Sequence, residues 1–112
     1  GIGQSTFSAT GALSVNGIIT STTPIPSISC NAGTGVLNVV STDQHGRFVA
    51  GAAAANCTIT FSSAYSKIPS CWCNDETAIV VVRAVATTTT LKCDVAIAFG
   101  GDTINYGCFA SP

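Results

Sequence analysis

The stretch NCTITF at residues 56–61 decides the fold class. Apolar side chains alternate along it with threonines, which is the pattern of a β-strand that places one face on a core. The same period of two returns in LKCDVAIAF at 91–99 and in DTINYGC at 102–108. In the last segment the residues that face away from the core are Thr103, Asn105 and Gly107. We therefore expect three half-buried strands over these segments.

Shorter apolar segments predict further strands at 35–40, 47–50, 70–74 and 78–86. Turn-forming residues separate the strands at 43–46, 62–69, 74–76 and 100–102. GAAAA at 51–55 could hold a helical turn but is too short for an independent helix. Strands repeated at roughly 8–12 residue spacing predict an all-β domain, an antiparallel β-sandwich or a jelly-roll-like arrangement.

The composition limits the functions that the chain can have. Of its 112 residues only 8% are charged, with 4 Lys and Arg against 5 Asp and Glu. Ser and Thr, which together supply 27 residues, solvate the surface instead. Four scattered cations do not form the basic patch that nucleic acid or anionic lipid requires. The longest apolar runs, 78–82 and 95–99, are far shorter than the ~20 residues of a membrane helix. We expect neither a nucleic-acid partner nor membrane insertion.

Six cysteines in a small, weakly charged chain indicate disulfide bonds and an oxidising, extracellular location. Six thiols allow 15 pairings, and the residues alone select none of them. The alternative is a zinc site at Cys71 and Cys73. Structural zinc needs four Cys or His ligands, usually with paired C-x₂₋₄-C spacing, whereas this spacing is C-x-C and the chain has one His. We therefore expect no metal and no cofactor.

The first third of the chain differs from the rest, because residues 1–29 contain neither a cysteine nor a charge. Pro24 and Pro26 predict an extended linker. The apolar residues before them are Leu13, Val15, Ile18 and Ile19. A segment this neutral and this apolar does not easily form a core of its own, so we expect it to bury these side chains against other copies or the neighbouring domain. We divide the chain into a connector arm, 1–26, and a disulfide-stapled head domain, 27–112.

Several motifs resemble those of trimeric phage tail fibres and tailspikes. GIG at 1–3 followed by LSVNG at 13–17 is similar to the connector that wraps around the threefold axis of such fibres. The remainder resembles a C-terminal module of the same proteins. Its matching motifs are SC at 29–30, CTITF at 57–61, Tyr65 with PSC at 69–71, TTTTL at 87–91 and GDTINYGC at 101–108. Cys73 and Cys93 are additions to this pattern.

The resemblance implies disulfides Cys30–Cys57 and Cys71–Cys108, with Cys73–Cys93 as an additional bridge. It also implies a homotrimer in a virion appendage, joined through the connector to other appendage proteins. The expected function is non-covalent attachment to a host-surface receptor, a glycan or a protein. Two alternatives stay open, which are a purely structural cap of a capsid or fibre and a subunit of an extracellular filament joined by donated strands.

The candidate receptor-binding residues surround the single tryptophan. If Cys71 and Cys73 face the core, Trp72 projects outward next to Asn74, Asp75 and Glu76. An exposed indole flanked by amides and carboxylates suits sugar stacking with hydrogen bonds to hydroxyls. The alternative is that Trp72 packs at a subunit interface.

Catalytic constellations are weak in this sequence. Ser41, Asp43 and His45 lie within five residues, whereas a catalytic triad is assembled from separate segments. A turn between neighbouring strands explains them better. Asp75 and Glu76 are adjacent and would diverge, unlike the paired carboxylates of a glycosidase. We therefore expect no enzymatic activity.

Overall fold

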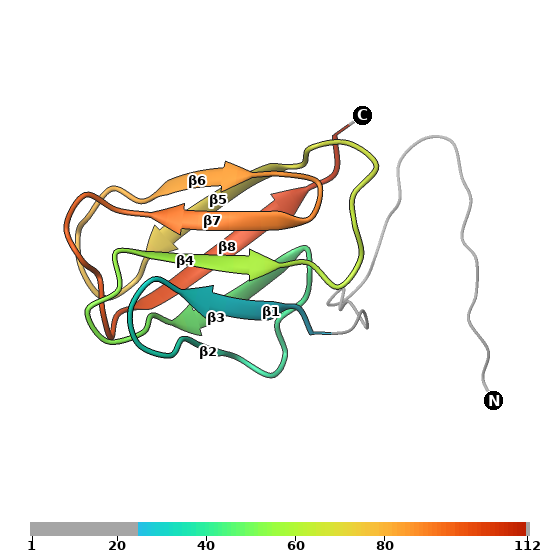
Figure 1. Cartoon of the computed structure of the whole chain (residues 1–112). Coiled ribbons are helices and arrows are strands. Elements are labelled where there is room, and N and C mark those ends of the chain that lie inside the picture. Colours follow the sequence, from blue (N-terminus) through green and yellow to red (C-terminus); the bar gives the residue numbers. More distant parts are fainter. Residues whose placement is uncertain (1–24, 112) are drawn as a thin grey trace, which may run out of the picture.

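The computed structural model describes residues 25–111 as two antiparallel four-stranded sheets packed face to face (Figure 1). The first sheet has the order β1 (Ser27–Cys30), β4 (Asn56–Thr60), β7 (Thr90–Asp94), β6 (Arg83–Ala86). The second sheet has the order β2 (Val36–Leu37), β3 (His45–Val49), β8 (Thr103–Phe109), β5 (Ser70–Asp75). The expected all-β sandwich is confirmed. The expected connector residues Leu13, Val15, Ile18 and Ile19 lie outside the described residues.

The core lies between the sheets and follows the period of two. In β4 and its neighbour β7, Ile59 and Leu91 are paired and fully buried. From the second sheet the largest buried side chains are Phe48, Ile104 and Tyr106. Burial of one such side chain contributes about 1.5–3 kcal/mol, so these five positions account for much of the packing that holds the sheets together. Among the described residues no helix is long and apolar enough to cross a membrane.

Two predicted strands are shorter than expected, because the chain changes sheets within them. The 78–86 prediction is wrong over 78–82, which connects β5 to β6, and there Ile79 and Val81 are exposed. The 91–99 prediction is wrong beyond Asp94, where β7 ends and the chain crosses to β8. Apolar residues in a segment that crosses between the sheets are not paired with a neighbouring strand. Alternation along the sequence therefore does not decide which way their side chains point.

Two further differences concern the first strands of the domain. The predicted 35–40 strand shrinks to the two residues of β2, because Asn38 turns the chain by accepting hydrogen bonds from the amides of Val40 and Ser41. β1 is a strand that the sequence did not predict, since Ile28 is its single large apolar residue. One large apolar residue does not make a strand pattern, and the pairing of β1 with β4 holds it in the sheet.

All six cysteines form disulfides, and their pairing is the one that the resemblance implied. Cys30–Cys57 and Cys71–Cys108 each join register partners within one sheet. Cys73–Cys93 joins β5 of the second sheet to β7 of the first. Three disulfides indicate an oxidising, extracellular environment.

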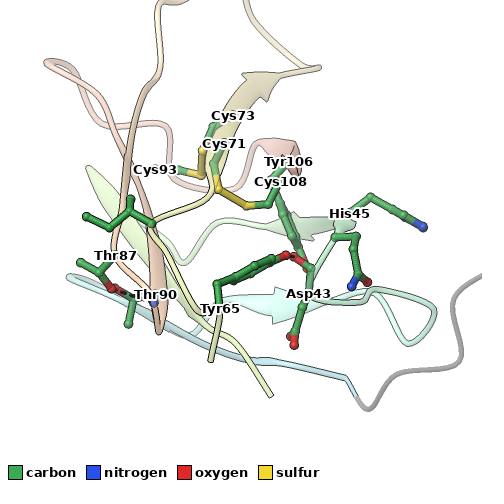
Figure 2. The surroundings of a disulfide bond; sticks show 12 residues. Asp43, His45, Tyr65, Cys71, Cys73, Thr87, Thr90, Cys93, Tyr106 and Cys108 are labelled. Atoms are coloured by element: carbon green, nitrogen blue, oxygen red, sulfur yellow. Dashed lines mark hydrogen bonds between the residues drawn. A yellow bond between two sulfur atoms is a disulfide. The ribbon is translucent and has the colours of Figure 1, made fainter. Parts of the chain in front are cut away.

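A buried carboxylate and two tyrosine hydroxyls hold the loop between β2 and β3 in place (Figure 2). Asp43 is 3% exposed and accepts hydrogen bonds from the Ser62 amide and hydroxyl and from the Ser63 amide. The Tyr65 hydroxyl donates to the Asp43 carbonyl oxygen, and the Tyr106 hydroxyl donates to the Thr42 carbonyl oxygen. This cluster therefore fixes the loop between β2 and β3 against the loop after β4 and against β8.

The same cluster accounts for the Ser41, Asp43 and His45 constellation. The Ser41 hydroxyl is hydrogen-bonded to the backbone of Arg47. The Asp43 carboxylate accepts its hydrogen bonds from Ser62 and Ser63. The His45 side chain points away from Asp43 (Figure 2). Ser41 and Asp43 thus shape the loop before β3, as the turn interpretation predicted, whereas His45 begins β3.

Removal of the bridge between the sheets is expected to be costly. The Cys73→Ala, Cys93→Ala double variant should lose about 3 kcal/mol of unfolding free energy, because a loop with a sequence separation of 20 is no longer closed in the unfolded chain. Urea denaturation of the oxidised proteins measures this. A loss under about 1 kcal/mol would contradict the assigned role.

The tyrosine cluster predicts a loss of stability at alkaline pH. Burial, and then the negative charge of Asp43, raise the pKa of both Tyr65 and Tyr106 above the ordinary 10.0. Because the folded state favours the neutral phenols, their contribution is complete below pH 10 and is lost as the pH rises through the folded values. The chain has only 2 tyrosines, so tyrosinate absorbance follows these two alone. Ionisation with ordinary pKa values in the folded protein would contradict the assignment.

Candidate functional site

The outer face of the second sheet brings together side chains from three strands. Its outward residues form two rows across β3, β8 and β5, which the strand register defines. The first row is His45, Gly107 and Trp72, and the second is Arg47, Asn105 and Asn74. Neighbouring strands lie about 4.8 Å apart, so each row is short enough for one small ligand to span it.

Trp72 rests directly on the backbone of β8. A Cβ atom at Gly107 would lie 2.6–2.7 Å from three atoms of the indole ring, which is closer than real contacts allow. The missing side chain of Gly107 therefore makes the seat for this ring. Trp72 remains 42% exposed, so a large part of the indole is open to solvent.

A shallow groove of about 270 Å³ lies beside the indole. Trp72, His45 and Asn105 contribute to it from the sheet, and Asn38 and Val40 from the loop after β2. Asn105 lines the groove, but its side-chain oxygen is buried and has no hydrogen-bond partner among the described residues. A buried acceptor without a donor is costly, so a turn of this carboxamide toward the groove, where a hydroxyl can donate to the oxygen, is favoured.

An ion pair crosses β8 at the border of the groove. Arg47 Nε lies 2.6 Å from Glu76 Oε1, and the side chains are 57% and 30% exposed. Exposed pairs of this kind contribute at most about 1 kcal/mol. The pair is therefore weak enough to open, and it places both a donor and an acceptor within reach of a polar ligand.

The structure separates the four predicted receptor-binding residues. Trp72 and Asn74 share the outer face, and Glu76 joins its border through Arg47. Asp75 does not belong to this face, because it is 7% exposed and points inward at the end of β5. The prediction is corrected at this residue: alternation along an extended strand sends Asp75 opposite to Asn74.

Three polar residues of the two rows are not in the predicted set, namely His45, Arg47 and Asn105. The period of two already turns Asn105 away from the core. His45 and Arg47 precede Trp72 by more than 20 residues in the chain, and only the pairing of β3 and β5 with β8 makes them neighbours. The alternative zinc site is overturned, since Cys71 and Cys73 are both consumed in disulfides.

Asp75 instead forms a carboxyl pair with Asp102. Its Oδ1 accepts hydrogen bonds from the amides of Thr77 and Ala78. Its Oδ2 is buried, and no donor of the described residues reaches it while Asp102 is ionised. Hydrogen bonding to Asp75, then burial and the charge of Asp75, raise the pKa of Asp102. The folded protein therefore favours a proton on Asp102, which lies in the hydrogen bond to Asp75.

The contact between Gly107 and the indole of Trp72 can be tested by adding a side chain at position 107. Gly107→Ala should displace the indole, increase its quenching by acrylamide and destabilise the fold by about 1 kcal/mol. In the Trp72→Ala background, Gly107→Ala should lower the free energy of unfolding much less, because the indole ring with which the new Cβ atom would clash is absent. Equal losses in the two backgrounds would contradict the contact.

The proton on Asp102 predicts a stability that falls as the pH rises. The folded pKa of Asp102 lies above its ordinary 3.8, so this contribution is complete below that pH and is lost as the pH rises through the folded value. Asp102→Asn supplies a permanent donor to Asp75, and should raise the melting temperature at pH 7 and flatten this part of the profile. Asp94→Asn is the matched control. An unchanged profile for Asp102→Asn would contradict the pairing.

Comparison with protein-family models, with curated proteins and with solved structures finds no match to this chain.

Proposed function

We propose that the head domain attaches a trimeric virion appendage, such as a tail fibre or tailspike, to a glycan on the host surface. The observation that carries this proposal is the half-exposed indole of Trp72, seated on Gly107 beside a polar groove. The binding is non-covalent and uses the outer face of the second sheet.

The chemistry of this face suits a sugar better than an apolar ligand. A pyranose ring presents one face of C–H groups, which stacks on an aromatic ring, and a rim of hydroxyl groups. The unpartnered oxygen of Asn105 can accept from such a hydroxyl, and Asn74 lies in the same row. A groove of about 270 Å³ is at the small end of ligand sites, which suits a short part of a glycan.

Other properties agree with an attachment module that works outside cells. Three disulfides and a charge content of 8% favour a stable surface with little long-range electrostatic attraction. The uncharged connector arm, 1–26, is the segment that would hold three copies together and join them to the other appendage proteins. The trimer and the virion location rest on the resemblance of its GIG and LSVNG motifs.

Fluorescence of the single tryptophan tests the proposal directly, because every change in signal comes from Trp72. The full non-reduced chain is titrated with neutral and with acidic oligosaccharides of bacterial surfaces, and binding to whole cells is measured in parallel. We expect saturable binding to at least one oligosaccharide. Trp72→Ala should weaken cell binding at least tenfold, and Trp72→Phe should keep part of it.

Ile68→Ala is the matched control, because Ile68 is an aliphatic residue that is 59% exposed between β4 and β5 and does not line the groove. It should bind as the unmodified chain does. Cell binding that is unaffected by Trp72→Ala would overturn the proposed site. Trp72 that is inaccessible to acrylamide in the assembled protein would favour a structural cap instead, with the indole buried between copies.

A further inference from the structure

An apolar groove of about 200 Å³ lies at one end of the sandwich, away from Trp72. We call it the end groove, and its lining residues are Val80, Val81, Val95, Ala96 and Ile97. Val95 is buried, while Val81 is 91% and Ile97 79% exposed. None of the five is charged. Single exposed aliphatic residues are common on proteins, but a contiguous cluster around a groove marks an interaction site.

The chain itself contains a segment that matches this groove. Residues 1–24 carry no charge, and their large aliphatic side chains cluster in LSVNGII at 13–19. Burial of this segment would leave no charged group without a partner. The segment is also too short to bury its aliphatic side chains in a core of its own. We propose that the 13–19 segment of one copy docks into the end groove of a second copy.

The direction of β1 favours a second copy over the same chain. Through β4, Ser27 is aligned with Thr90 of β7 and Cys30 with Cys93, so β1 runs toward the end where β7 stops (Figure 1). The end groove lies at this end, because Val95 directly follows β7. Residues 25 and 26, which precede β1, are therefore at the opposite end of the sheet. Pro26, and Pro24 before it, disfavour an immediate reversal because proline and its preceding residue prefer extended conformations.

The backbone next to the end groove can also accept a partner. β6 is an edge strand of the first sheet, hydrogen-bonded to β7 on one side. An exposed edge beside apolar side chains is the usual acceptor for a strand from another chain. The donor leaves from β1, at the opposite edge of the same sheet, so the contact is head to tail. Such a contact gives a closed ring when the rotation closes, as for three copies, and an open filament when it does not.

This inference deepens the association of copies that the proposed function assumes, but it uses a different part of the molecule. The end groove involves the crossings between the sheets, whereas the glycan face lies on β3, β8 and β5. The two proposals can therefore fail separately.

Complementary charges test the docking in the full non-reduced chain. Val81→Lys puts a charge into the end groove, and Ile18→Glu puts one into the arm. Light scattering over a concentration series gives the dissociation constant of the assembly. We expect each single variant to raise this constant at least tenfold, and the Val81→Lys, Ile18→Glu double variant to recover most of the loss.

Val36→Lys and Thr6→Glu are the matched controls, since Val36 is 62% exposed on β2 and residue 6 lies in the arm outside the docking segment. Both should assemble normally. An unmodified chain that stays monomeric overturns the docking, as does an assembly that Ile18→Glu leaves intact. Loss of assembly in both single variants without recovery in the double variant also overturns it. Titration of the single variants with oligosaccharides, followed by Trp72 fluorescence, tests the proposed glycan binding independently of assembly.

Discussion

The orientation of one short strand, β5, controls both the core and the candidate site. Cys71 and Cys73 lie on the same side of this strand, and each is held covalently by a different partner strand, β8 and β7. Because successive side chains of a strand alternate, the two disulfides on one side of β5 place Trp72 on the other side. A register slip of one residue would exchange the two faces, and the disulfides forbid it. The packing of the sheets and the exposure of the indole thus have the same cause.

The loop between β2 and β3 is the second determinant of the site, and it is held by polar instead of apolar contacts. Asp43 lies deep in the protein with its carboxylate oxygens satisfied by Ser62 and Ser63. Two tyrosine hydroxyls fix the adjacent carbonyl oxygens. Because the loop is anchored at Thr42 and Asp43, its preceding residues Asn38 and Val40 stand at a defined edge of the groove. A buried network of this kind rigidifies a surface loop without a helix or strand.

The sequence predicts the parts of the fold where alternation is strong and hydrogen bonding is regular. It finds β4 and β8 because every second residue in them is apolar, and both sit at the centre of their sheets or next to it. It fails at 78–82 and after Asp94, where aliphatic residues serve a crossing instead of a strand. It identifies Trp72 and Asn74 but not His45 or Arg47, because strand pairing is a long-range property that local patterns do not contain. Asp75 is adjacent to Asn74 in the sequence but faces the other side of β5, because successive side chains of a strand alternate.

The seat of Trp72 on Gly107 has a consequence for how this domain can evolve. A large aromatic ring at position 72 requires glycine at position 107, so these two positions should change together among relatives. Positions 45, 47, 74 and 105 face outward in the neighbouring rows and carry no such restriction from the core. The outer face can therefore vary at these four positions while the inner face stays constant. Its surface chemistry can change without any change in the packing between the two sheets.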